Sequence, residues 1–230
     1  MSATTETTKW ENPAKRFVAF FDIMGFKELV ERNSHQDIVK KLGALKVTLN
    51  TMEEFGHYNR LKKKHDGEIK SITFSDSIII FSKSDSAQDA EEIITTSSVL
   101  ISMAIGQGIA IKGAISYGEI TVDFDNSIFF GRPIIDAYLL HDQLQLYGMV
   151  FDHFSEEKIN TMEIKPNIKK LFIKYKANMK TGRIMHTIVS LGFKTDHLKN
   201  LEKLYFKVSG GPRVYIDNTV EFYNSYTENK

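Results

Sequence analysis

The chain has 230 residues with a formal net charge of +1 at pH 7, and 42% of them are hydrophobic while 26% are charged. This balance is typical of a folded domain with a sizeable core, and a near-neutral charge gives no electrostatic basis for binding nucleic acid or an anionic membrane. The absence of cysteine excludes disulfides, thiol catalysis and thiolate metal sites.

Residues 1–14 are polar for most of their length and are expected to form a disordered leader. This segment lacks the apolar core of a signal peptide. No run in the chain approaches the ~18 apolar residues of a membrane span. A cytoplasmic protein without membrane contact is therefore expected.

Apolar periodicity predicts the next elements in chain order. They are a strand over 16–23, two helices within 26–56 that separate at 33–35, a hairpin with arms at 69–75 and 77–83, a helix over 87–104, strands over 109–116 and 118–122, a helix over 134–146 and a strand over 149–154. This order predicts an α+β core over residues 15–154, with a ferredoxin-like βαββαβ sheet and its helices on one face.

Residues 155–230 are predicted to be an appended C-terminal extension. It contains a second hairpin, with arms at 170–175 and 183–191, and a short helix at 196–203. We expect this extension to complete the sheet or to form a dimer contact.

Two aspartates stand in apolar, strand-like runs. Asp22 follows Phe17–Phe21, and Asp76 interrupts the run from Ile72 to Phe81. Carboxylates in such surroundings are costly unless something pairs with them, and oxygen ligands suit Mg²⁺ or Mn²⁺. A phosphate-handling enzyme is thus the first hypothesis. Each residue also has an ordinary structural interpretation, Asp22 as a helix N-cap and Asp76 as a turn residue.

The segment after Asp22 has the features of an anion site. The backbone amides of Ile23, Met24, Gly25 and Phe26 are predicted to lie at a helix N-terminus, where a phosphate group can bind. Gly25 would let phosphate approach the backbone closely, although a glycine there also suits a plain turn.

Four segments resemble the class III nucleotidyl cyclases, the family of adenylate and guanylate cyclase catalytic domains. They are Phe21-Asp22-Ile23-Met24-Gly25-Phe26, Phe74-Ser75-Asp76-Ser77, Lys112-Gly113-Ala114-Ile115-Ser116-Tyr117-Gly118-Glu119 and Phe130-Gly131-Arg132-Pro133-Ile134-Ile135-Asp136-Ala137-Tyr138. The resemblance covers residues 16–154. It implies a reaction in which the 3′-hydroxyl of a nucleoside triphosphate attacks the α-phosphate and pyrophosphate leaves.

The resemblance also implies roles for particular residues. Asp22, Ile23 and Asp76 are the metal-binding positions for two Mg²⁺ or Mn²⁺ ions, and the two aspartates are the catalytic positions. Met24, Gly25, Phe26, Ile72 and Asp136 take substrate-binding positions. The family works as a head-to-tail homodimer with shared sites, in which one subunit gives the aspartates and the other gives the helix after Gly131.

Four positions depart from the pattern of the purine cyclases, because each is apolar here. They are Ile72 at the purine-reading lysine, Ile128 at its polar companion, Ile135 at the ribose-orienting asparagine and Leu139 at the transition-state arginine. Arg132, Arg183, Lys112 and the basic loop at 62–64 are the candidates for a replacement cation.

This combination is similar to the stand-alone bacterial pyrimidine cyclases of Pycsar antiphage defence. Those enzymes share the sequence motifs at Gly113–Gly118 and Gly131–Tyr138, and they make cyclic UMP or cyclic CMP, which activates a separate effector. The predicted function is a pyrimidine cyclase that prefers UTP to CTP. The alternatives are an inactive cyclase-like module that binds a nucleotide or a partner, and a purine cyclase with shifted base determinants.

Overall fold

A computed structural model describes residues 10–61, 67–190, 197–206 and 208–228. The elements, in chain order, are β1 (Ala14–Ile23), α1 (Phe26–Arg32), α2 (His35–Leu61), β2 (Ile69–Phe74), β3 (Ser77–Ser82), α3 (Ala87–Gly106), β4 (Ile111–Asp123), β5 (Ile128–Gly131), α4 (Arg132–Gln143), β6 (Met149–Phe151), α5 (His153–Asn160), α6 (Pro166–Lys169), β7 (Phe172–Met179), β8 (Gly182–Val189), α7 (His197–Tyr205) and α8 (Pro212–Glu228).

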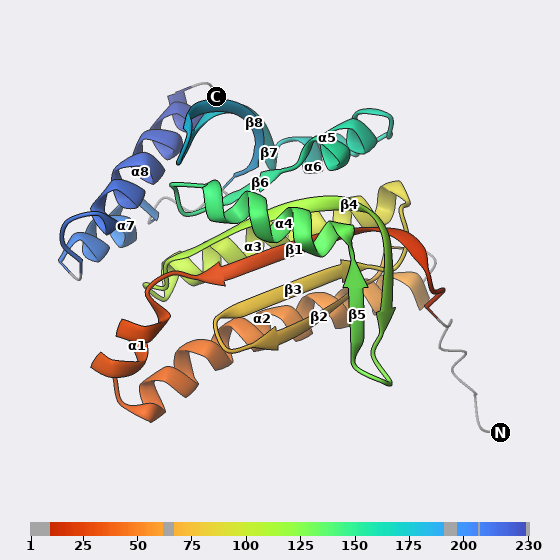
Figure 1. The fold of residues 1–230 in the computed structure, drawn as a ribbon, viewed down its shortest axis with the longest axis horizontal. Helices are drawn as coiled ribbons and strands as arrows, with labels where there is room; N and C mark the ends of the chain where they lie inside the picture. Colours follow the sequence, from red (N-terminus) through yellow and green to blue (C-terminus); the bar gives the residue numbers. More distant parts are fainter. Residues whose placement is uncertain (1–9, 62–66, 191–196, 207, 229–230) are drawn as a thin grey trace.

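Within the described residues the strands form one eight-stranded sheet in the order β2-β3-β1-β4-β6-β8-β7, with β5 pairing the end of β4 (Figure 1). β1 is central and runs antiparallel to both β3 and β4. The order β2-β3-β1-β4, with α2 and α3 as the connecting helices, is that of a ferredoxin-like core. The predicted α+β fold class is confirmed.

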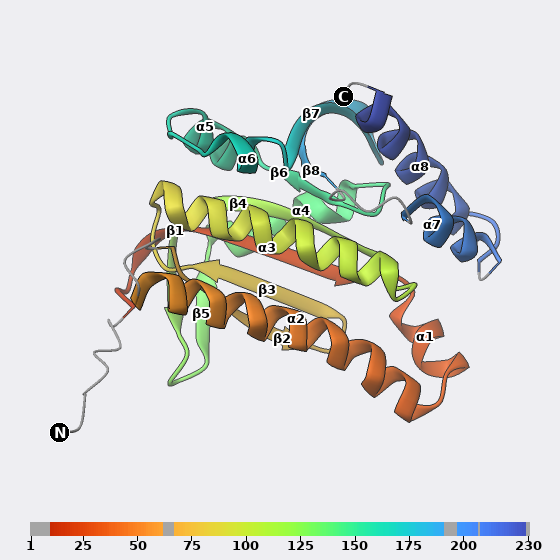
Figure 2. The same ribbon diagram turned by 180° about the vertical axis from the view of Figure 1, so that it is seen from behind.

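The helices cover both faces of this sheet. Figures 1 and 2 show α2 and α3 on one face and α4 on the other. The centroid of the Phe20 ring on β1 lies 5.5 Å from the ring centroid of Tyr138 and 4.8 Å from that of His141, and both of these residues are on α4. The expectation that all helices share one face is therefore wrong for α4, because the β4–β5 hairpin brings the chain to the opposite face before this helix begins.

Several element boundaries differ from the predictions. β4 is one strand of 13 residues, because Gly118 keeps its place in the ladder opposite Arg16. The strand predicted at 149–154 ends at Phe151, since the Asp152 side chain accepts a hydrogen bond from the Ser155 amide (2.7 Å) and caps α5. Helix α8 was not predicted.

The predicted C-terminal hairpin forms, with arms at Phe172–Met179 and Gly182–Val189 in place of 170–175 and 183–191. It joins the same sheet, since Val150 on β6 pairs with Ile188 on β8. At the other end of the chain, residues 1–9 of the expected leader lie outside the described residues. Trp10 is 8% exposed and its indole donates to Glu68 (3.3 Å), while the Asn12 side chain pairs with the Val122 backbone. These residues therefore pack against the sheet.

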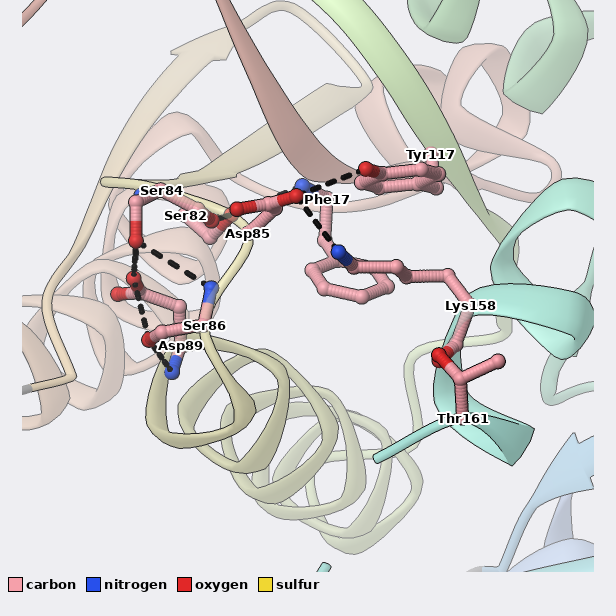
Figure 3. Close-up of polar contacts among 9 residues, drawn as sticks. All are labelled: Phe17, Ser82, Ser84, Asp85, Ser86, Asp89, Tyr117, Lys158 and Thr161. Carbon is pink, nitrogen blue, oxygen red and sulfur yellow. Dashed lines mark hydrogen bonds and ion pairs between the residues drawn. The ribbon is translucent and has the colours of Figure 1, made fainter. Parts of the chain in front are cut away.

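A polar network fixes the start of α3 (Figure 3). Asp89 accepts hydrogen bonds from Ser84 and Ser86, and Ser86 in turn accepts from the Asp89 amide (3.1 Å) as the N-cap. Asp85 accepts from the Tyr117 hydroxyl (2.8 Å) and the Lys158 ammonium (2.6 Å). The β3–α3 loop is thereby tied to β4 and to α5.

None of the helices in the described part of the chain combines the length and apolar character needed to cross a membrane.

Gly113 leaves no room for a side chain where β1, β4 and β6 pack together. A Cβ there would lie 2.7 Å from the Met149 Cε and would clash with the Phe20 carbonyl oxygen. We expect Gly113→Ala to lower the free energy of unfolding by about 1–3 kcal/mol, as overpacking does, in urea denaturation. Gly106→Ala at the end of α3 is the control, because a Cβ there meets nothing within 4 Å. Equal stability of the two variants would contradict this account.

Candidate active site

Asp22 lies near the C-terminal end of β1, on the same face of the sheet as Phe20 and hence as α4. Its cross-strand partners are Ser77 on β3 and Lys112 on β4. Helix α1 begins four residues later, at Phe26, with Gly25 as its N-cap residue, and the described structure shows no side-chain cap there. The interpretation of Asp22 as a helix cap is therefore excluded, and its carboxylate remains available.

Asp76 lies in the two-residue turn between β2 and β3, as predicted. Its carbonyl oxygen accepts a hydrogen bond from the Ile23 amide (2.9 Å), so the turn is attached to the end of β1 beside Asp22. Ser75 in the same turn has a φ of 56°, which is uncommon for a residue other than glycine. Such backbone outliers concentrate at functional sites.

The charge around Asp22 is not balanced. The pKa of Asp22 is raised, chiefly by burial and next by the negative charge of Asp76, with a further contribution from Asp142. Lys112 opposes these effects but does not outweigh them. The two predicted aspartates thus lie within electrostatic reach of each other, and a bound cation would offset the excess negative charge.

Lys112 is the candidate cation that the fold places beside Asp22. The residue is 3% exposed, and its ammonium donates to the backbone carbonyls of Asp142 (3.3 Å) and Leu144 (3.2 Å). Burial lowers the pKa of Lys112, while the charges of Asp142 and Asp22 act in the opposite direction.

The other candidate cations lie elsewhere in the chain. Arg132 is at the start of α4 and pairs with Asp136 (3.1 Å), so both residues already have a partner. Arg183 on β8 pairs with Glu221 on α8 (2.8 Å). The basic loop at 62–64 lies outside the described residues.

The predicted anion site has fewer free backbone amides than expected. The Ile23 amide bonds to Asp76 and the Met24 amide bonds to the Ala110 carbonyl (2.8 Å), so neither can bind phosphate. Gly25 and Phe26 are left as amide donors, at the start of a helix of only seven residues. Gly25 has a φ of 67°, which explains the glycine.

The four apolar residues that depart from the pattern of the purine cyclases fall into two groups: Ile72 alone, and Ile128, Ile135 and Leu139 together. Ile72 pairs with Ile79 and packs in the cluster with Val18 and Phe81, on the same face of the sheet as Asp22. The others are exposed on the segment β5–α4, which forms the near face in Figure 1. We name this segment's exposed residues the α4 apolar surface: Ile128, Phe130, Ile135, Tyr138 and Leu139.

The C-terminal extension supports the segment that holds Lys112, a role that the sequence did not indicate. The Asn218 side chain donates to the Gln145 carbonyl (2.7 Å), and the Thr219 hydroxyl accepts from the Tyr147 amide (2.8 Å). Lys180 in the β7–β8 turn pairs with Asp142 (2.7 Å). These contacts hold the segment whose carbonyls accept from Lys112, and no local sequence signal announces them.

Among the described residues no three acidic or histidine side chains come together as a ready metal site. A pair of carboxylates nevertheless suits Mg²⁺, which keeps several waters and is bound through one or two carboxylates plus substrate phosphates. The donor set of Asp22 and Asp76 therefore fits such an ion.

No protein-family model and no curated protein matches the sequence. Several solved structures are similar in fold. The catalytic core of a rhodopsin-guanylyl cyclase with converted specificity, in complex with ATPαS, has a TM-score of 0.56 and 13% identity, over 77% of this chain and 96% of that one.

Two further solved structures have a similar fold. A non-canonical dimeric guanylyl cyclase domain of the RhoGC fusion protein from the aquatic fungus Blastocladiella emersonii has a TM-score of 0.56 and 16% identity, over 80% of this chain and 97% of that one. A bacterial light-regulated adenylyl cyclase has a TM-score of 0.53 and 14% identity, over 84% and 99%. The chain therefore has the fold of adenylyl and guanylyl cyclase catalytic domains.

The raised pKa of Asp22 implies that the folding stability of the protein depends on pH. Because the folded-state pKa lies above the unfolded one, stability is lost as the pH rises through the folded pKa, and ionised Asp22 destabilises the fold. We expect metal-free Asp22→Asn to have a higher midpoint of thermal unfolding than wild type at about pH 7, with the gap closing towards about pH 4.

The control for this measurement is Asp125→Asn, which removes an exposed carboxylate from the β4–β5 turn and should show no such gap. A less stable Asp22→Asn protein at neutral pH would show that Lys112 outweighs burial.

Proposed function

We propose that this protein is a metal-dependent nucleotidyl cyclase that converts a pyrimidine nucleoside triphosphate to the 3′,5′-cyclic monophosphate and pyrophosphate. One observation carries the proposal: the Ile23–Asp76 hydrogen bond joins the two aspartate-bearing elements at the end of the central strand, in a cyclase-type sheet.

Asp22 and Asp76 are the residues that would hold Mg²⁺ or Mn²⁺. Their oxygens are hard ligands. The pKa of Asp22 is raised first by burial and then by the negative charge of Asp76, and a bound cation would stabilise the ionised carboxylate against both. When bound, a pair of such ions stabilises both the attacking and the leaving oxygen of an in-line displacement.

The chain itself supplies a positive charge and an ordered frame. In the reaction the 3′-oxygen bonds to the α-phosphorus, the bond from that phosphorus to the bridging oxygen breaks, and the hydroxyl proton passes to solvent. Lys112 faces Asp22 across the β1–β4 ladder, where a fixed ammonium would stabilise phosphate charge. Its two carbonyl partners keep the side chain in place.

Base selection is the finer part of the proposal. Ile72 lies on the same face of the sheet as Asp22, but its side chain has no polar group that could form a hydrogen bond with a purine base. This supports a pyrimidine substrate, with UTP preferred to CTP. By its resemblance to the Pycsar enzymes, the protein would make cyclic UMP as a second messenger in antiviral defence.

A homodimer would complete the site. The α4 apolar surface includes Leu139 at 57% exposure and Phe130 at 62%, and large apolar side chains gathered on one face favour burial in an interface. The segment β5–α4 would then approach the aspartates of the partner subunit.

A non-catalytic module that binds a nucleotide or a partner is the second candidate. Ile135 and Leu139 favour it, because exposed aliphatic side chains cannot orient a ribose or stabilise phosphate charge. A purine cyclase with shifted determinants is the third, and one assay separates all three.

In that assay the protein is incubated with Mn²⁺ and the four ribonucleoside triphosphates, and products are resolved by mass. We expect cyclic UMP and pyrophosphate. Asp22→Ala and Asp76→Ala should each abolish the product, and Lys112→Met should lower the rate by about 10²-fold or more through the loss of phosphate stabilisation. Arg183→Met, which removes a cation that Glu221 already pairs, is the control and should retain activity.

Full turnover by either aspartate variant would refute the metal assignment. Thermal stabilisation by nucleotide without product would favour the non-catalytic module, and a cyclic purine product would favour the third candidate.

The dimer is tested by Leu139→Glu, which places a charge in the α4 apolar surface. We expect sedimentation to show a dimer for wild type and a monomer for the variant, with cyclase activity lost, because desolvating an unpaired carboxylate opposes association. Glu119→Gln, a charge change on β4 outside that surface, is the control. A monomeric wild type with full activity would contradict shared sites.

A further inference from the structure

A cavity of about 360 Å³ lies between α2 and the β2–β3 hairpin. Its walls include the aliphatic side chains of Ile23, Leu42 and Ile78, with Gly43 and Lys46 on α2 and Ser75 in the turn. The volume falls within the ~300–1,000 Å³ that small-molecule pockets have. This cavity is separate from the candidate active site.

The two sites lie on opposite faces of one sheet. Consecutive residues of a strand point to opposite faces, so Asp22 points to the α4 side while Ile23 lines the cavity on the α2 side. Ser75, which also lines the cavity, precedes Asp76. The cavity therefore lies on the face opposite Asp22 and beside the turn that carries Asp76.

Gly43 keeps the α2 wall open. It lies within a helix of 27 residues, where glycine costs roughly 1 kcal/mol relative to alanine. A Cβ at this position would meet no atom within 4 Å, so a larger side chain would enter the open space. The helix carries a destabilising residue at the place where a side chain would fill the cavity.

Lys46 brings a positive charge to this apolar wall. The side chain is half-buried, and no acidic group pairs with it in the part of the chain that the structure describes. Its helical neighbours three and four residues away are uncharged: Leu42, Gly43, Leu49 and Asn50. A half-buried ammonium beside aliphatic walls favours a ligand that brings both an anionic group and an apolar body.

We propose that the cavity binds a monocarboxylate with an apolar chain, a medium-chain fatty acid anion. Its carboxylate contacts the Lys46 ammonium, and its chain lies against Ile23, Leu42 and Ile78. The binding does not rest on the proposed cyclase function, because it needs neither nucleotide nor metal.

The test is isothermal titration of the full chain with sodium decanoate, below the concentration at which decanoate forms micelles and without nucleotide or metal. We expect saturable binding of one decanoate per chain. Gly43→Leu, which fills the cavity, should abolish binding while the protein unfolds at the same or a higher temperature than wild type.

Decanol separates the role of charge from that of apolar contact. Wild type should bind it at least about tenfold more weakly than decanoate, the scale of one lost charged hydrogen bond, and Lys46→Met should bind both equally weakly. Lys40→Met, an exposed lysine of the same helix, should bind decanoate as wild type does.

Three results would overturn the proposal: no saturable binding of decanoate to wild type, unchanged decanoate affinity in Lys46→Met, or unchanged affinity in folded Gly43→Leu. If Gly43→Leu does not fold, the Lys46→Met comparison alone decides.

Discussion

Along β1, consecutive side chains point to opposite faces of the sheet, and both the core and the candidate site depend on this alternation. Phe17 and Phe21 have no exposed surface and belong to the main core, on the side of α2 and α3. Phe20 packs under α4 instead, and Asp22 follows on that same face opposite Lys112. A slip of the register by one residue would exchange the faces and turn the carboxylate towards the core.

Because of this alternation the sheet holds the Asp22 carboxylate in an environment that disfavours its ionised form. Burial and, next, the nearby charge of Asp76 raise the pKa of Asp22, and the positive charge of Lys112 offsets only part of these two effects. A site with unbalanced negative charge is poor for stability and suited to a cation, a combination often seen where function has priority. The strained Ser75 in the adjoining turn belongs to the same pattern.

The C-terminal extension contributes to this site from a distance. β8 continues the sheet beyond β6, and α8 holds the segment after α4 through Asn218 and Thr219. That segment supplies the Leu144 carbonyl that accepts from Lys112. The extension is thus part of the frame that positions the buried lysine, in addition to lengthening the sheet.

Local patterns in the sequence determined the core strands, the break between α1 and α2, the β2–β3 turn with Asp76, and the position of Asp22 at a strand end, because each is a matter of spacing over a few residues. Only the tertiary structure decided that α4 covers the opposite face, that the Ile23 and Met24 amides are already bonded, and that Lys112 rather than Arg183 lies beside Asp22. It alone also revealed the cavity beside the turn. These features join residues tens of positions apart, and hydrophobic periodicity carries no information about such pairings.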